Sequence, residues 1–170
     1  MFRFDDFFAE LGGFALVDPS RLAEFYHGQV QGRDLLTEFT TTERGEKVPT
    51  EGIVVPLLGV APGFYRIIVR SSSEPSAIAT PLVESRGWVL CAHTGKLVLS
   101  ALGYLARWDN EHPQHRRIEV EPGWYEVEIL GCPLEASEGD EDGVYEIVLI
   151  KVEKRPTYKA STIQSLSLLD

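Results

Sequence analysis

Residues 120–130 read Val120-Glu-Pro-Gly-Trp-Tyr-Glu-Val-Glu-Ile-Leu130, and this stretch decides the fold class. Proline presets a negative φ and glycine accepts a positive one, so Pro122-Gly123 predicts a tight turn. The aromatic and β-branched residues that follow alternate with glutamates, which is typical of a strand with one buried face. The stretch therefore predicts a half-buried β-strand that begins directly after a turn.

The same pattern occurs sixty positions earlier, where residues 60–69 read Val60-Ala-Pro-Gly-Phe-Tyr-Arg-Ile-Ile-Val69. Each copy is followed by a polar loop and a strand led by glycine, Gly87 or Gly143. Two related β units would explain the repeat, and independent Pro-Gly-aromatic openings would explain it equally well. Either origin predicts a mainly β protein, and we expect a two-sheet β-sandwich.

Other short segments rich in β-branched and aromatic residues lie between turn-forming residues. The expected strands cover residues 35–42, 53–58, 65–70, 88–92, 96–100, 124–130 and 145–151. Pro56 places its strand at an edge or bulge, because proline cannot donate to a ladder. Thr94-Gly95 is expected to be a hairpin turn, and residues 97–108 favour a strand over a helix.

The sequence patterns that predict helices are confined to residues 1–28. Phe4, Phe7, Phe8 and Leu11 recur at three- and four-residue spacing, which predicts a short helix. A second short helix is expected after Asp18-Pro19, which suits an N-cap and first helical residue. The 170 residues are then one domain: a helical segment 1–33, a sandwich 34–155 and a loosely attached extension 156–170.

The net charge of −10 is concentrated in one segment. Residues 109–146 hold twelve acids and two bases, whereas the remainder holds fourteen of each. Such a chain lacks the basic patch that nucleic-acid or membrane-surface binding requires. No signal peptide or membrane-spanning run is evident, so we expect a cytoplasmic protein in which Cys91 and Cys132 are reduced.

The acidic segment has a predicted geometry. Glu119 and Glu121 share one strand face, and Glu126 and Glu128 share a face of the next strand. If Pro122-Gly123 joins these strands as a ribbon, four carboxylates lie together and a mobile acidic loop follows. The candidate partner-binding residues are Glu119, Glu121, Glu126, Glu128, Glu135, Glu138, Asp140, Glu141 and Asp142. They would steer a basic partner or mimic phosphates, or they would only keep the protein soluble.

Sequence motifs for catalysis are absent or incomplete. The chain has no G-x-S-x-G, G-x-G-x-x-G or H-E-x-x-H motif. A metal-dependent hydrolase would have to use Cys91, His93 and His112, whose spacing does not bring four ligands together. We expect no cofactor and no resident metal.

The three tryptophans have two interpretations. Trp88 lies in an apolar run and is expected in the core. Trp108 and Trp124 are flanked by polar or turn residues. They could anchor a partner, or they could stack on a sugar in a carbohydrate- or small-ligand-binding sandwich.

Three segments carry a resemblance to a known family: Thr80-Pro-Leu-Val-Glu-Ser-Arg-Gly-Trp-Val-Leu90, Ile118-Glu-Val-Glu-Pro-Gly-Trp-Tyr-Glu-Val127 and Tyr145-Glu-Ile-Val-Leu-Ile150. Across residues 60–152 the chain resembles the competence-associated inhibitors of the bacterial DNA-entry nuclease. The resemblance implies a β-sandwich that binds and blocks a nuclease. Together with the charge, it favours a non-enzymatic inhibitor or immunity protein for a basic toxin or nuclease.

Overall fold

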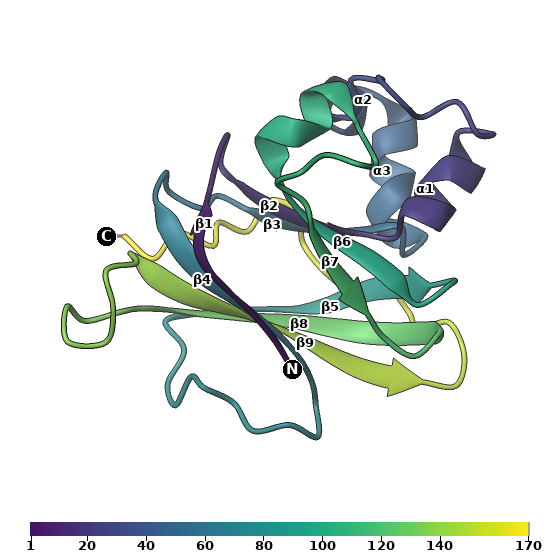
Figure 1. Cartoon of the computed structure of the whole chain (residues 1–170). Coiled ribbons are helices and arrows are strands. Elements are labelled where there is room, and N and C mark those ends of the chain that lie inside the picture. Colours follow the sequence, from purple (N-terminus) through teal and green to yellow (C-terminus); the bar gives the residue numbers. More distant parts are fainter. Residues whose placement is uncertain (170) are drawn as a thin grey trace.

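The computed structural model describes residues 1–169 and contains two β-sheets with helices packed on one of them (Figure 1). The five-stranded sheet has the order β1 (Phe2–Phe8), β4 (Phe64–Ser71), β9 (Gly143–Val152), β8 (Gly123–Pro133), β5 (Val83–Ala92). The four-stranded sheet has the order β3 (Val54–Leu58), β2 (Gly13–Val17), β6 (Lys96–Ala101), β7 (Arg116–Glu119). The prediction of a mainly β, two-sheet fold is confirmed.

The main core lies between the two sheets. Ile67, Val127 and Ile147 of the five-stranded sheet are buried in the same cluster as Leu16 and Leu99 of the four-stranded sheet. Trp88 is also part of this core, as its apolar surroundings predict. Most strand pairs are antiparallel, whereas β4 and β9 run parallel.

A second core lies between the four-stranded sheet and the helices. These helices are α1 (Pro19–Phe25), α2 (Leu35–Thr41), α3 (Glu43–Thr50) and the 3₁₀ helix η1 (Leu102–Arg107). Leu22, Leu35 and Val48 pack there with Val17 and Val98 of the sheet. Both faces of β2 are therefore covered, and all its residues are buried. No helix within residues 1–169 is long and apolar enough to cross a membrane.

The predicted helix at residues 4–11 is wrong, because most of this segment is strand β1 paired with β4. A β-bulge between Phe4 and Phe7 sets Asp5 and Asp6 against a single partner position. The extra residue changes the alternation, so inward-facing phenylalanines acquire a helix-like spacing. Segment 1–33 accordingly contains two strands and one helix; α1, capped by Asp18, is the helix that the sequence predicts.

The predicted strand at residues 35–42 is wrong, because this segment forms helix α2 and is followed directly by helix α3. The threonine-rich sequence favours a strand, but its hydroxyls satisfy helical carbonyls instead. Thr40 Oγ1 donates to Leu36 O at 2.8 Å, and Thr41 Oγ1 donates to Thr37 O at 2.6 Å. Packing of this helix against α3 and η1 outweighs its β propensity, so segment 34–155 is not strand throughout.

The predicted Thr94-Gly95 hairpin is also wrong, because β5 and β6 lie in different sheets. This turn carries the chain from one layer of the sandwich to the other. The 97–108 segment divides between β6 and η1. Pro56 lies on β3, an edge strand of its sheet, as predicted.

The C-terminal extension is firmly attached, contrary to the expectation from sequence. Leu166 and Leu168 are buried in the main core. Leu166 O accepts a hydrogen bond from Tyr145 Oη at 2.6 Å, and Leu166 N donates to Leu58 O at 2.9 Å. We call residues 156–169 the C-terminal strap, because they cross the molecule and bond to both sheets.

Candidate functional site

The predicted ribbon of four glutamates does not form. Pro122-Gly123 connects β7 of one sheet to β8 of the other, and these two strands do not pair. Glu119 ends β7 and Glu121 lies in the connection, so neither is on a strand beside Glu126 and Glu128. Glu126 and Glu128 do share the outward face of β8, because Tyr125, Val127 and Ile129 point into the core. Glu128 lies 3.7 Å from Arg86.

The other two glutamates have basic neighbours of their own. Glu121 forms an ion pair with Lys151. Glu119 is opposite Lys96 in the pairing of β6 with β7. These four carboxylates are therefore dispersed, and nearby cations compensate most of them.

The acidic loop, residues 135–142, connects β8 to β9 and has a defined structure. Glu138 N donates to Glu135 O at 2.8 Å, and Glu135 N donates to Glu138 Oε2 at 3.1 Å. Asp142 N donates to Phe64 O at 2.8 Å, while Phe64 N donates to Asp142 Oδ2 at 3.0 Å. A Cβ at Gly63 would collide with that carboxylate, so the Pro-Gly pair before β4 also makes room for the loop.

Arg66 holds the acidic loop against the sheet. Its Nη2 donates to Glu141 Oε2 at 3.1 Å and to Glu138 O at 3.3 Å. Its Nε donates to Asp5 Oδ1 at 3.1 Å. A hydrogen bond from Arg3, together with the charges of Arg3 and Arg66, lowers the pKa of Asp5. Glu141 is buried in this pair, so its carboxylate has a structural role and contributes little to the surface charge.

An exposed aromatic pair that was not predicted from the sequence lies beside the acidic loop. Phe8 and Phe64 face each other across β1 and β4, with ring centroids 5.0 Å apart. Phe8 follows Phe7 in the sequence, and Phe64 precedes Tyr65. Phe7 and Tyr65 are both buried. The signal was present in the sequence: adjacent aromatic residues in a strand point to opposite faces, so one of each pair must leave the core.

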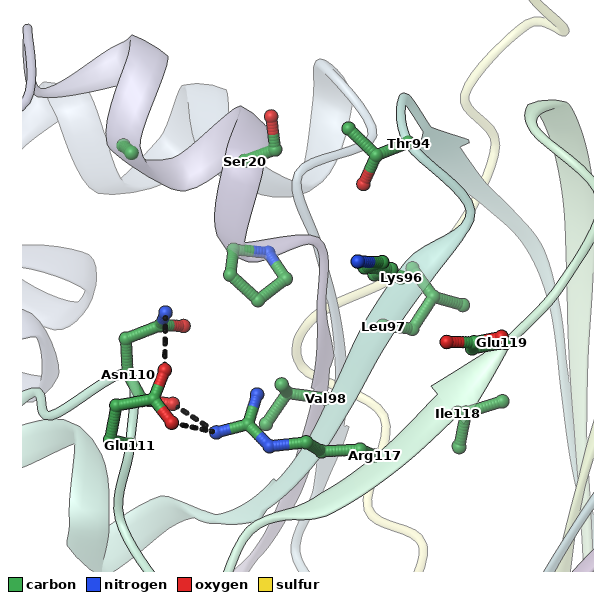
Figure 2. Close-up of a pocket in the computed structure, with 12 residues that line it drawn as sticks. Ser20, Thr94, Lys96, Leu97, Val98, Asn110, Glu111, Arg117, Ile118 and Glu119 are labelled. Carbon is green, nitrogen blue, oxygen red and sulfur yellow. Dashed lines mark hydrogen bonds and ion pairs between the residues drawn. The ribbon is translucent and has the colours of Figure 1, made fainter.

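Figure 2 shows a groove of about 570 Å³ between α1 and the β6–β7 edge of the four-stranded sheet. Arg117 crosses its floor and pairs with Glu111 at 3.3 Å. Lys96 and Glu119 contribute one charge of each sign to the opposite wall. The groove therefore has charges of both signs around an apolar base that includes Leu97, Val98 and Ile118.

The structure excludes Trp108 as an exposed anchor, because its side chain is 1% exposed. It stacks on His115 with ring centroids 4.9 Å apart. Trp124 is half-buried, and Arg155 lies over its ring at 5.6 Å. Trp108 is therefore wrong as a stacking face, whereas Trp124 stays a prediction.

The candidate metal ligands do not converge. Among residues 1–169, no group of three or more His, Cys, Asp and Glu side chains is placed to hold a metal ion. Burial raises the pKa of the Cys91 thiol, which makes that group a poorer ligand or nucleophile. His93 is exposed, and His112 packs on Tyr104 at 4.2 Å between ring centroids.

No family model matches this chain, and no curated protein matches its sequence. Similarity appears at the level of structure. One is described as ComJ from Bacillus subtilis, inhibitor of the DNA-degrading activity of NucA. That match has a TM-score of 0.53 at 9% identity and covers 89% of this chain and 96% of ComJ.

A second structure, described as crocagin biosynthetic gene J, has a TM-score of 0.48 at 17% identity. It covers 87% of this chain and 98% of the other. The resemblance to the competence nuclease inhibitors is thus confirmed for the fold. It extends beyond residues 60–152 to nearly the whole chain.

Proposed function

We propose that this protein is a non-enzymatic inhibitor that binds and blocks a basic protein partner, and that the partner is a nuclease or nuclease-like toxin. The observation that carries the proposal is the fold shared with ComJ over 89% of the chain, because ComJ inhibits a nuclease. Fold alone does not define function. The acidic loop on the surface independently favours a basic partner.

Exposed carboxylates on an ordered loop suit electrostatic recognition of a basic partner. Asp140 and Glu135 are exposed, and no hydrogen bond or ion pair involves their side chains among the described contacts. Nucleases present cations where they bind phosphates, so such carboxylates would raise the association rate and compete for that site. We also place the protein in the cytoplasm, where Cys91 and Cys132 would remain thiols; fractionation of the source cells tests this.

The test begins with affinity capture from the source cells at low and then moderate salt, with mass spectrometry of the eluate. We expect one basic protein that is lost as the salt concentration rises. The purified partner should degrade DNA, and the present protein should abolish that activity near a one-to-one ratio. A partner without nuclease activity would contradict the nuclease assignment, and capture of no basic protein would contradict the inhibitor proposal as a whole.

A further inference from the structure

An exposed apolar pair lies on the outward face of the five-stranded sheet. Phe8 is 46% exposed and Phe64 is 50% exposed, although their strand neighbours Phe7 and Tyr65 are 5% and 1% exposed. Phenylalanine has no polar group that would benefit from water. Two such rings, packed against each other at a tilt of 51°, suit an interaction site.

The β-bulge in β1 determines that Phe8 is outside. Asp6 has a φ of 51° within the bulge, a left-handed conformation that aspartate tolerates better than most residues. Regular alternation from Phe2 and Phe4 would direct position 8 inward, and the extra residue directs it outward instead. The bulge also leaves Asp5 and Asp6 exposed near Arg66. Bulges that re-aim side chains are frequent beside functional sites.

Carboxylates surround the aromatic pair. Asp142 bonds to the backbone of Phe64, and Arg66 joins Asp5 to the acidic loop. Arg3 and Arg66 are already paired with Asp5 or Glu141, and the nearby Arg116 lies over the Phe7 ring at 5.4 Å. The region thus combines an apolar centre with an acidic rim. We call it the Phe8–Phe64 surface, which comprises Phe8, Phe64, Asp5, Asp6, Glu138, Asp140 and Asp142.

We propose that the Phe8–Phe64 surface is the docking site for the basic partner, and that the two rings form its apolar anchor. The inference rests on the proposed inhibitor function and deepens it. An arginine or lysine of the partner could lie over the rings in a cation–π contact while its neighbours pair with the carboxylates. A partner loop rich in arginine can both cover the rings and pair with the carboxylates. A purely apolar loop can only cover the rings, and an acidic loop can do neither.

The first experiment compares two variants in binding to the purified partner. Phe8→Ser combined with Phe64→Ser should weaken binding at least tenfold, since buried aromatic anchors dominate interface energetics. Ile163→Ser is the matched control, because Ile163 is 94% exposed and belongs to the C-terminal strap. The control should bind like the wild type. Thermal unfolding of both variants shows whether either substitution disturbs the fold.

The outcomes separate this inference from the proposed function. A partner that binds the double variant as tightly as the wild type overturns the docking site but leaves the inhibitor function intact. An equal loss of affinity in Ile163→Ser also overturns it. A concentration-dependent dimer that the double variant abolishes would assign the pair to a second copy of this chain, and it would overturn the proposal as well.

A second experiment does not depend on the natural partner. A hexa-arginine peptide is titrated into the full-length protein and followed by amide chemical shifts. We expect the shifts to concentrate at residues 5–8, 64–66 and 138–142, and to decrease at least threefold in the double variant. Shifts centred on Glu126 and Glu128, or none at saturating peptide, would contradict the docking site.

Discussion

Two tyrosines explain the sequence repeat at the level of single residues. Tyr65 Oη donates to Ala61 O at 2.7 Å, and Tyr125 Oη donates to Glu121 O at 2.5 Å. Each hydroxyl closes the Pro-Gly turn onto the carbonyl four residues earlier, so the two copies share one local structure. They do not share surroundings, since β8 pairs with the strand that follows it and β4 does not. The repeat is therefore a repeated turn, and it does not extend to two equivalent sheet units.

This turn structure predicts the effect of removing either hydroxyl. Tyr65→Phe and Tyr125→Phe should each lower the free energy of unfolding by about 1 kcal/mol, with a half-buried carbonyl left unpaired. Tyr104→Phe is the control, because its hydroxyl makes no hydrogen bond among the described contacts. Urea unfolding of the three variants measures the differences. Equal stability of all three would show that the hydroxyls do not secure the turns.

His115 makes the stability of the fold depend on pH. Its Nε2 lies 2.9 Å from Asp109 O, and its Nδ1 is buried without a partner. A second proton would have no acceptor, and burial lowers the pKa of this imidazole below its usual 6.5. Around it, His112 and Arg117 oppose protonation, whereas Asp109 favours it. The folded protein thus binds fewer protons than the unfolded chain below that pH.

It follows that the free energy of unfolding should decrease as the pH falls below about 6.5. Above that pH both states hold a neutral imidazole, and the contribution disappears. His115→Gln should flatten this dependence, whereas His93→Gln should leave it unchanged because His93 is exposed. Urea titrations at pH 5.5, 6.5 and 7.5 provide the comparison. A wild-type stability that is constant over this range would refute the assignment.

Among the elements, those with strong alternation were predictable and those shaped by tertiary contacts were not. The strands around Tyr65, Trp88, Tyr125 and Tyr145 follow from their own residues. Helix α2 does not, because its threonines favour a strand and only packing against α3 and η1 makes the segment helical. The bulge at Asp6 could not be predicted either, since it depends on the pairing of β1 with β4. Because of this bulge, the phenylalanines of β1 have a helix-like spacing in the sequence, and the regular alternation wrongly places Phe8 in the core.

The C-terminal strap predicts a strong effect of substitutions near the end of the chain. Leu166→Ala should lower the free energy of unfolding by about 2–5 kcal/mol, because Leu166 is buried between the sheets. Leu169→Ala is the control, since Leu169 is exposed. Guanidinium unfolding of both variants tests the contrast. A loss in Leu166→Ala no larger than in Leu169→Ala would restore the expectation of a loose tail.

At the scale of the whole molecule, the charge segment was predictable but its geometry was not. The count of acids between Asp109 and Glu146 comes directly from the sequence. Whether Pro122-Gly123 turns back within a sheet or crosses to another depends on long-range pairing: β7 pairs with β6, whereas β8 pairs with β5 and β9. The crossing places Glu119 and Glu126 on strands of different sheets. Of the predicted site, the acidic loop is the part whose carboxylates stay together.

This arrangement predicts that the acidic loop, and not the charge elsewhere, sets the association rate with a basic partner. Glu135→Lys combined with Asp140→Lys should slow association roughly tenfold at about 0.1 M salt and flatten its salt dependence, with little change in dissociation. Glu126→Lys combined with Glu153→Lys changes the net charge equally at the opposite end of the sheet. Because screening limits exposed charges to about 10 Å at 0.1 M salt, this control should slow association much less. Stopped-flow measurements across a salt series decide the matter: equal effects of the two pairs would mean that only net charge steers the partner.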